Sequence, residues 1–269
     1  MLVHLPFVGV FPLSKADPTR LVTAAVLLIG DEILSGRTKD ANLTFIATFL
    51  GNMGIQVHEV RVVRDDRDCI AEAVNVLRAT YDYVFTTGGI GPTHDDITAD
   101  SVAHAFGVPI GLHPQAMEIL TQHYEETGGE FTEARQRMAR IPEGGSLVAN
   151  PISKAPGFQL ENVFVMAGIP IIVQVMMDDI ADRLKGGARM LSRTIDCHVG
   201  EGTIAIDLGE VQERFPLVII GSYPFFRDKQ YGTSLVLRSI ESEILDKAVQ
   251  ATMELVEKVG GAPVERSAS

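Results

Sequence analysis

The sequence predicts an α/β fold: a three-layer α/β/α domain with a mostly parallel sheet, followed by a small α+β domain. Two observations lead to this prediction. Over residues 21–185, short apolar runs typical of strands alternate with segments of helical spacing, which is the pattern of βαβ units. After the glycine pair at 186–187, the pattern changes to a shorter arrangement of strands and helices.

The first strand and its neighbours define the start of the sheet. Residues 21–30 are an unbroken apolar run that ends in glycine, as expected of a strand buried on both faces. Residues 40–50 and 67–80 place apolar side chains on one helical stripe, whereas 56–63 and 83–87 have strand character. Because connections between parallel strands are right-handed, these segments predict a sheet covered by helices.

The same periodicity predicts the rest of the first domain, residues 21–186. Further helices are expected at 96–106, 114–127, 131–140 and 170–185. Further strands are expected around 146–149, 157–160 and 162–167.

The second domain, residues 187–260, is predicted to have the order βαββα. Its elements are expected at 194–199, 202–214, 217–221, 234–239 and 241–259. Gly221-Ser222-Tyr223-Pro224 is expected to be a tight turn with an exposed aromatic ring, a loop fixed by proline rather than a functional site. Residues 1–20 are expected to be a loose N-terminal extension and residues 261–269 a polar tail.

Composition narrows the classes of function. The net charge of −12 argues against nucleic-acid binding, which requires a basic surface, but allows a small anionic ligand held by backbone amides and a metal. No segment reaches the ~20 apolar residues of a membrane-spanning helix, so no membrane association is expected. Cys69 and Cys197 lack a CxxC spacing, so we expect reduced, structural cysteines and a cytoplasmic location.

The most informative segment is residues 84–100, Val-Phe-Thr-Thr-Gly-Gly-Ile-Gly-Pro-Thr-His-Asp-Asp-Ile-Thr-Ala-Asp. A strand runs into a glycine turn, where backbone N–H groups can approach a phosphate because no Cβ intervenes. The acids that follow would repel a phosphate unless a divalent cation lies between them. The turn lacks the spacing of dinucleotide folds and of P-loops, so neither a nicotinamide dehydrogenase nor a Walker-type NTPase is supported. The segment therefore predicts a site for a phosphorylated ligand.

Four such loops are predicted at one edge of the sheet, because ligands of open parallel sheets bind beyond the carboxyl ends of the strands. The loops are residues 30–36, 63–66, 86–100 and 166–170, and each contains a glycine or a pair of acids. The predicted ligand-binding residues in and beside them are Gly30, Asp31, Glu32, Asn42, Thr86, Thr87, Gly88, Gly89, Gly91, Asp100, Gly168 and Pro170.

The carboxylates have structural and functional interpretations. Asp95 can cap the helix after the glycine turn, whereas Asp96 and Asp100, spaced i, i+4 on one helical face, would repel each other without a cation. Asp65 and Asp66 precede a helix and are as readily capping residues as site residues. The predicted metal ligands are Asp31, Asp65 and Asp96.

Three further side chains are candidates on position alone. His94 is as readily a solvated loop residue as a metal ligand. Lys154 and Arg37 are the nearest candidates for contacts to a phosphate.

The chain resembles the MoaB/Mog molybdopterin-binding superfamily, in particular the N-terminal part of competence/damage-inducible protein A (CinA). The most specific segment is Thr86-Thr-Gly-Gly-Ile-Gly-Pro-Thr-His-Asp-Asp-Ile-Thr98. The supporting segments are Gly30-Asp-Glu-Ile-Leu-Ser-Gly36, Asp40-Ala-Asn42, Asp65-Asp66 and Ala167-Gly-Ile-Pro170, and the resemblance covers residues 22–185. Residues 190–259 are similar to the small KH-like middle domain of CinA proteins, without the glycine loop of RNA-binding KH domains.

The resemblance implies that the glycine turn forms the floor of the ligand pocket. In the branch of the superfamily that makes the molybdenum cofactor, acids at the positions of Asp65 and Asp96 assist adenylylation of molybdopterin, so these two are the predicted catalytic residues. In the CinA branch and in the related domain of FAD synthases, the pocket is linked to hydrolysis of ADP-ribose or FAD with a divalent metal, Mg²⁺ or Co²⁺, and K⁺. Relatives also imply a homo-oligomer.

Two positions depart from the family pattern. The usual Leu-Pro-Gly of the fourth loop is Met166-Ala167-Gly168, and the usual Asp-Thr-Asn is Asp40-Ala41-Asn42, which lacks one hydroxyl. Neither the amidohydrolase domain of full-length CinA nor a domain that synthesises FAD is expected in this chain.

The sequence thus favours a CinA-type protein that binds a phosphorylated pterin or nucleotide and acts as a metal-dependent nucleotide pyrophosphohydrolase. One alternative is a non-catalytic molybdopterin-binding module. The other is an enzyme of molybdenum-cofactor biosynthesis that adenylylates molybdopterin.

Overall fold

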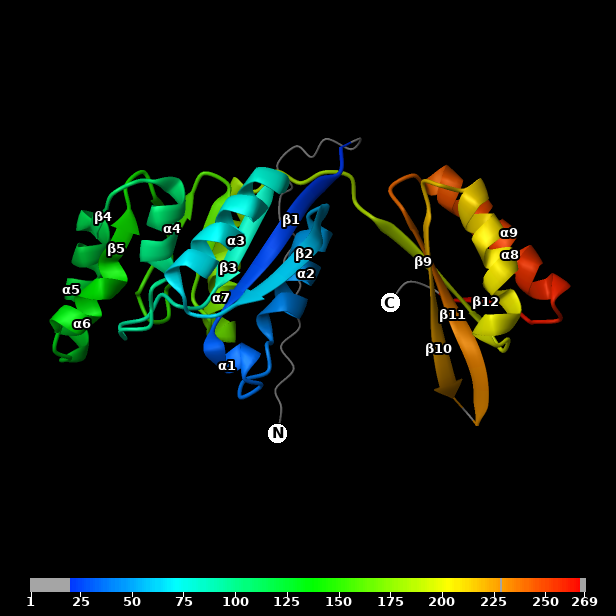
Figure 1. Ribbon diagram of the computed structural model, residues 1–269, viewed down its shortest axis with the longest axis horizontal. Coiled ribbons are helices and arrows are strands. Elements are labelled where there is room, and N and C mark those ends of the chain that lie inside the picture. The colour runs from blue at the N-terminus through cyan, green and yellow to red at the C-terminus, as the bar shows by residue number, and fades with distance from the viewer. Residues whose placement is uncertain (1–19, 228, 267–269) are drawn as a thin grey trace. The chain divides into compact units, whose positions relative to one another are not determined.

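The computed structural model describes residues 20–227 and 229–266, so residues 1–19 of the expected N-terminal extension lie outside the described residues. The chain divides between Ala188 and Arg189 into two compact units. Figure 1 shows the helices and strands of each unit.

The N-terminal unit is built on a six-stranded sheet. In spatial order its strands are β2 (Ile55–Val63), β1 (Val22–Ile29), β3 (Tyr83–Thr87), β8 (Val163–Met166), β7 (Gly157–Leu160) and β6 (Ser146–Val148). The first four are parallel, and β7 is antiparallel to both of its neighbours. The predicted, mostly parallel sheet is confirmed.

Helices cover both faces of this sheet and give the predicted three layers. One face is covered by α2 (Asn42–Asn52) and α7 (Pro170–Ile180), and the other by α3 (Arg67–Thr80) and α4 (Thr98–Phe106). The helix α3 begins directly after its N-cap residue, Asp66. The Asp66 side chain accepts hydrogen bonds from two backbone N–H groups of the first turn.

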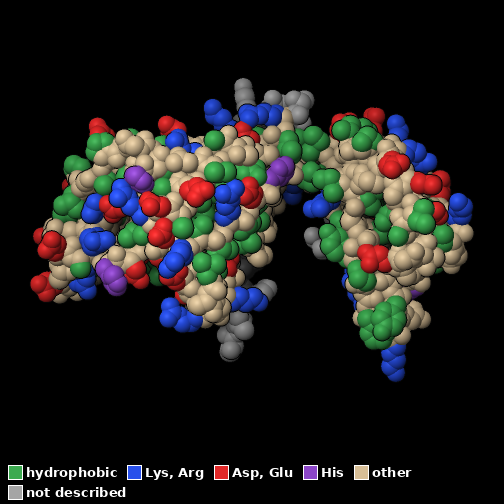
Figure 2. All heavy atoms as spheres, viewed as in Figure 1, with side chains coloured by type: hydrophobic (Ala, Val, Ile, Leu, Met, Phe, Trp, Pro, Cys, Tyr) green, Lys and Arg blue, Asp and Glu red, His purple; other side chains and the backbone are tan. Residues whose placement is uncertain are grey.

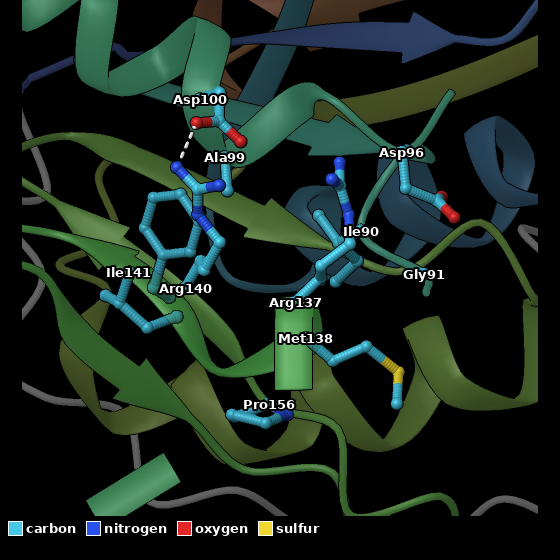
Figure 3. A pocket seen from close by; sticks show the side chains of 12 residues that line it. Ile90, Gly91, Asp96, Ala99, Asp100, Arg137, Met138, Arg140, Ile141 and Pro156 are labelled. Carbon is cyan, nitrogen blue, oxygen red and sulfur yellow. Dashed lines mark hydrogen bonds and ion pairs between the residues drawn. The ribbon is translucent and has the colours of Figure 1, made fainter. Parts of the chain in front are cut away.

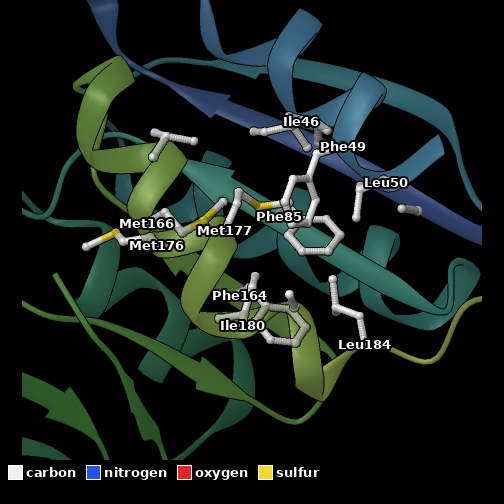
Figure 4. Packing of buried hydrophobic residues seen from close by; sticks show 14 of the residues in the cluster. Ile46, Phe49, Leu50, Phe85, Phe164, Met166, Met176, Met177, Ile180 and Leu184 are labelled. Carbon is white, nitrogen blue, oxygen red and sulfur yellow. The ribbon is translucent and has the colours of Figure 1, made fainter. Parts of the chain in front are cut away.

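The core of the N-terminal unit has two halves, one on each face of the sheet. Alternate residues of β1 enter the two halves, because successive side chains of a strand point to opposite faces. In the half shown in Figure 4, the stacked rings of Phe85 and Phe164 lie 5.2 Å apart beside Met176 and Met177 of α7. The predicted burial of β1 on both faces is confirmed.

Beyond α4 the chain forms a small excursion with a core of its own. Its elements are β4 (Ile110–Leu112), α5 (Pro114–Thr127), α6 (Glu133–Gln136), the 3-10 helix η1 (Arg137–Ala139) and β5 (Arg140–Pro142). Ala116, Leu120 and Ala139 of this excursion form a small buried cluster together with Ala155, which precedes β7. The helix predicted at 131–140 is therefore wrong near its end, because Arg140 leaves the helical path to pair with Leu112 of β4.

The C-terminal unit is an antiparallel sheet of order β10-β11-β9-β12, with a core shared by two helices. Its elements are β9 (Leu191–Cys197), α8 (Glu201–Arg214), β10 (Ile219–Arg227), β11 (Gln230–Ser239), α9 (Ser242–Lys258) and β12 (Val264–Arg266). The α+β class predicted for this unit is confirmed.

Two local predictions for this unit are wrong. The segment from Gly221 to Pro224 is not a turn, because it pairs with β11 as part of a long hairpin and leaves Tyr223 exposed. Residues 264–266 form a strand rather than part of a polar tail, because they pair with β9 and Glu265 forms an ion pair with Arg193.

Adjacent isoleucines of α7 provide a matched test of the core. Ile172 is 5% exposed and belongs to the core, whereas Ile171 is 58% exposed. We expect Ile172→Ala to lower the free energy of unfolding of the N-terminal unit by about 2–5 kcal/mol. Ile171→Ala should change it by no more than about 0.5 kcal/mol, as measured by denaturant unfolding. Equal effects of the two substitutions would contradict the packing of α7 on the sheet.

Candidate functional site

The loops after β1, β2, β3 and β8 meet at one edge of the sheet. The strand order reverses here, because β2 lies on one side of β1 and the next strand in the chain, β3, lies on the other. The Gly30 N–H donates to the Val63 carbonyl at 3.1 Å, which joins the loops after β1 and β2. The Gly88 N–H donates to the Met166 carbonyl at 3.2 Å, which joins the loops after β3 and β8. This reversal of strand order at the carboxyl edge is where open parallel sheets bind ligands.

The glycine turn after β3 depends on two positions without a side chain. Gly88 and Gly89 have φ of 104° and 66°, which glycine adopts readily. A Cβ on Gly88 would lie 2.2 Å from the Ile29 carbonyl oxygen, so the turn can approach the end of β1 only with glycine there. The Thr98 hydroxyl donates to the Gly88 carbonyl at 3.0 Å and ties the turn to the start of α4.

The backbone N–H groups available to a ligand are those after Gly88. The amide of Gly88, predicted to hold phosphate, is bonded to Met166 and is not free. The N–H groups of Gly89, Ile90 and Gly91 have no acceptor among the described residues. These three consecutive amides are the part of the predicted anion cradle that the structure leaves open.

A cavity of about 80 Å³, the Asn42 cavity, lies between the loops after β1, β3 and β8. Predicted residues in its lining are Glu32, Asn42, Thr87, Gly88, Gly168 and Pro170, accompanied by Thr38 and Lys39. Asn42 is 5% exposed, and its Nδ2 donates to the Gly168 carbonyl at 2.8 Å. Its buried Oδ1 accepts no hydrogen bond from the described residues. Because a buried acceptor without a donor is costly, this oxygen is suited to a ligand N–H or O–H.

A second cavity, the Arg137 cavity, is formed by the next residues of the glycine turn (Figure 3). Its polar and glycine lining is Gly89, Gly91, Asp96, Asp100, Arg137 and Arg140. The Arg140 Nη2 donates to the Asp100 Oδ1 at 2.5 Å, which connects α4 with β5. The two cavities thus adjoin consecutive residues of one turn.

Four carboxylates gather beside the loops after β1, β2 and β3. Asp31 and Glu32 lie in the short helix α1 (Asp31–Leu34), and the Asp65 Oδ2 accepts a hydrogen bond from the Asp31 N–H at 2.9 Å. Burial raises the pKa of Asp65, and the negative charges of Glu32, Asp31 and Asp95 raise it further, although the hydrogen bond from Asp31 opposes this. A cation bound near Asp65 would relieve this repulsion.

The three predicted metal ligands do not assemble into one centre. Within residues 20–227 and 229–266, no group of three or more His, Cys, Asp or Glu side chains is arranged to hold a metal ion. The Asp31 Oδ1 lies 3.9 Å from the Arg64 Nε. The Asp96 Oδ2 accepts from the N–H and the hydroxyl of Thr93 at 2.8 and 2.5 Å, so Asp96 is bonded within its own turn. Asp65 and Asp31 are joined by a hydrogen bond from the Asp31 backbone N–H, and the Asp31 carboxylate itself faces Arg64.

Asp96 and Asp100 do not share a helical face, contrary to the prediction from their spacing. The helix α4 begins at Thr98, after Asp96. Asp100 lies within α4, and its cation is Arg140 rather than a metal ion. Both acids nevertheless line the Arg137 cavity.

The other candidates lie outside the two cavities. The side chain of His94 is 98% exposed and lies 3.9 Å from Asp95. Arg37 and Lys154 line neither cavity. Thr86 is fully buried in β3, and its hydroxyl has no hydrogen-bond partner among the described residues.

Sequence reasoning missed three cationic residues of the site. These are Lys39 in the Asn42 cavity and Arg137 and Arg140 in the Arg137 cavity. Lys39 directly precedes the Asp40-Ala41-Asn42 segment, which is a signal that could have found it. The two arginines follow a short helix far along the chain, and only the tertiary structure places them at the turn.

Figure 2 shows acidic and basic side chains interspersed over the visible face of the N-terminal unit rather than a continuous basic patch. None of the helices in the described part of the chain is long and apolar enough to span a membrane.

Comparison with protein families identifies both units. Residues 25–186 match the model of a probable molybdopterin binding domain. The chain belongs to this family, the MoaB/Mog superfamily. Residues 189–261 match the model of the middle domain of FAD synthase. In this molybdopterin-binding-domain protein, the matched N-terminal segment contains the four loops and both cavities.

The relatives agree with this assignment. A probable FAD synthase of Caenorhabditis briggsae is 30% identical over 90% of this chain and 51% of its own length. A CinA-like protein of Citrifermentans bemidjiense is 38% identical over 58% of this chain and 38% of its own length. The chain therefore spans about half or less of these relatives. The solved structure of CinA from Thermoplasma acidophilum, whose function is described as unknown, has 32% identity and a TM-score of 0.56 over 60% of this chain and 96% of that chain. The predicted relation to CinA is confirmed.

The raised pKa of Asp65 predicts a pH-dependent cost to stability. Because the native state binds this proton more tightly than the unfolded chain, the ionised carboxylate destabilises the fold at neutral pH. The cost is fully present above the raised pKa and vanishes below the ordinary value of 3.8. We therefore expect Asp65→Asn to be more stable than the unsubstituted protein at pH 7, and the gain to shrink as the pH falls toward 3.8.

Thermal or urea unfolding across this pH range measures the effect. The matched control is Asp68→Asn, because the Asp68 side chain is 91% exposed. Its stability should stay within about 0.5 kcal/mol of the unsubstituted protein. An Asp65→Asn variant that is no more stable at pH 7 would contradict the repulsion among these acids.

Proposed function

We propose that the protein binds a phosphorylated pterin or nucleotide at the edge of the sheet and hydrolyses a diphosphate bond with the help of a divalent metal ion. The observation that carries the proposal is the run of three unbonded amides at Gly89, Ile90 and Gly91, next to the buried, unpaired oxygen of Asn42. The amides suit a phosphate, and the oxygen suits an N–H or O–H of a heterocycle or sugar.

The relatives support a nucleotide as the ligand. The C-terminal unit resembles the middle domain of FAD synthase, and relatives along most of this chain are named probable FAD synthases. FAD and ADP-ribose both contain a diphosphate between two larger groups. We infer that a molecule of this class lies along the turn, between the Asn42 cavity and Arg137.

Each site residue has a defined part in the proposed reaction. The amides of the turn stabilise negative charge that develops on the phosphate oxygens. Asp65, with Asp31, would hold the metal ion, which when bound polarises the phosphorus centre and lowers the pKa of a bound water. Asp96 lines the Arg137 cavity beside Gly91 and is placed to orient the attacking water, while its bond to Thr93 keeps its carboxylate in position.

Asp96 provides the test of catalysis. We expect Asp96→Asn and Asp65→Asn each to reduce the hydrolysis of ADP-ribose or FAD, measured with Mg²⁺ or Co²⁺ and K⁺, by roughly a hundredfold or more. Asp68→Asn, an exposed acid of the neighbouring helix, should retain full activity. If Asp96→Asn were as active as the unsubstituted protein, the catalytic role would be wrong.

A non-catalytic molybdopterin-binding module is the second candidate function. It is favoured by the match to a molybdopterin-binding family. Calorimetry with molybdopterin and with ADP-ribose, followed by analysis of the products, separates the two. Turnover of ADP-ribose supports the hydrolase, whereas tight binding of molybdopterin without turnover of either ligand supports the binding module.

Asn42 provides a test of binding that does not depend on catalysis. Asn42→Ala removes the unpaired Oδ1, so the affinity for the nucleotide should fall roughly tenfold. The matched control is Asn75→Ala, because Asn75 is exposed on α3 and bonds only to Arg78. Equal affinities of the two variants would show that the Asn42 cavity does not contact the ligand.

A further inference from the structure

Arg137 lines the site and has no part in the proposed mechanism. It begins the 3-10 helix η1 and lines the cavity formed by Gly89, Ile90 and Gly91. Its Nε atom is buried and donates no hydrogen bond to any described residue. In Figure 3 its side chain lies beside Ile90 and extends in the direction of Asp96.

A buried guanidinium Nε without a partner is costly, because the group stays protonated and this atom has lost its hydration, while the Arg137 side chain as a whole is half-buried. The neighbouring Arg140 does have a partner of opposite charge, because its Nη2 donates a hydrogen bond to the Asp100 carboxylate at 2.5 Å. Within the described part of the chain, Arg137 forms no such ion pair. Its missing partner is therefore expected to be an anion that the protein does not supply.

The surroundings of Arg137 indicate which kind of anion. On one side are the unbonded amides of the turn, which suit a first phosphate. On the other side, Arg137 and Arg140 also line an open groove of about 390 Å³, whose remaining wall is Leu112, Glu133, Ala134 and Gln136. A phosphate on Arg137 would thus lie between the turn and a groove large enough for a further group.

We propose that Arg137 binds the second phosphate of a diphosphate ligand, and that the group attached to this phosphate lies in the groove beside Ala134. This inference rests on the proposed function and assigns residues to the second phosphate of its diphosphate ligand and to the group attached to that phosphate. A nucleoside monophosphate would use the turn and the Asn42 cavity alone. The bidentate geometry of guanidinium toward phosphate oxygens explains an arginine at this position.

The test compares ligands with one and two phosphates. Binding of AMP and of α,β-methylene-ADP, which resists cleavage, is measured by calorimetry with Mg²⁺. We expect Arg137→Gln to weaken binding of α,β-methylene-ADP roughly tenfold or more and to leave AMP binding unchanged. Arg137→Lys keeps the charge but loses the bidentate guanidinium geometry. Its affinity for α,β-methylene-ADP should therefore lie between those of the unsubstituted protein and Arg137→Gln. The control Arg238→Gln removes the same charge from an exposed position of the C-terminal unit and should bind both ligands normally.

The outcomes separate this inference from the proposed function. If the unsubstituted protein binds neither nucleotide, the proposed function and this inference both fail. The alternative is that the unsubstituted protein binds both AMP and α,β-methylene-ADP. If Arg137→Gln then keeps its affinity for both nucleotides, or loses affinity for both equally, only the assignment of Arg137 fails. Thermal unfolding of each variant shows whether a loss of binding comes from a loss of the fold.

A second measurement tests the groove. Ala134 is exposed, so Ala134→Trp can fill the groove without disturbing a core. We expect this variant to weaken binding of the α,β-methylene analogue of ADP-ribose but not of α,β-methylene-ADP. Ala79→Trp, at an exposed position of α3, is the matched control. Unchanged binding of both analogues by Ala134→Trp would overturn the placement of the second group.

Discussion

The close passage of the glycine turn over the end of β1 is the constraint on which the site depends. Only hydrogen fits between the Gly88 Cα and the Ile29 carbonyl, so β3 can end directly against its neighbour. The turn then reaches the Met166 carbonyl on the other side. Three strands are thereby brought together at one edge, and the next amides of the chain are left without partners. The binding surface is thus a direct result of how tightly the sheet is assembled.

The electrostatics of this edge oppose stability. Carboxylates around Asp65 repel one another, and a guanidinium at Arg137 lacks a counter-ion. In a protein selected for stability alone, we would expect these carboxylates and this guanidinium to have partners of opposite charge. Such local conflicts are typical of functional sites, where a ligand supplies the missing partner. Cation and phosphate together would satisfy both the acids and the arginine.

The sequence predicted those parts of the molecule that depend on local patterns. The apolar run of β1, the capped start of α3 and the glycine turn are each encoded within a few residues, and each was found. The errors concern pairings across long separations. Arg140 neutralises an acid 40 positions earlier, and residues 264–266 become a strand only because β9 has a free edge. Periodicity carries no information about such partners.

The Asp96 turn shows a different limit of sequence reasoning. A spacing of four residues suggested one helical face, but the helix begins only at Thr98 because the preceding turn is closed by the bond between Thr93 and Asp96. Helix boundaries are set by such competing hydrogen bonds, which short spacing rules do not resolve. Asp96 stays a prediction as a site residue, while the structural reason given for it was wrong.

The small excursion around α5 and α6 gives the site a second wall, which the Arg140–Asp100 bond ties to α4. The glycine turn rests on the main sheet, whereas Arg137 stands on a segment with a separate core that includes Leu120 and Ala139. Related chains could therefore alter the length or packing of this excursion and change which ligands fit, while the turn itself stays the same. Ligand selectivity and ligand anchoring would then evolve on different parts of the chain.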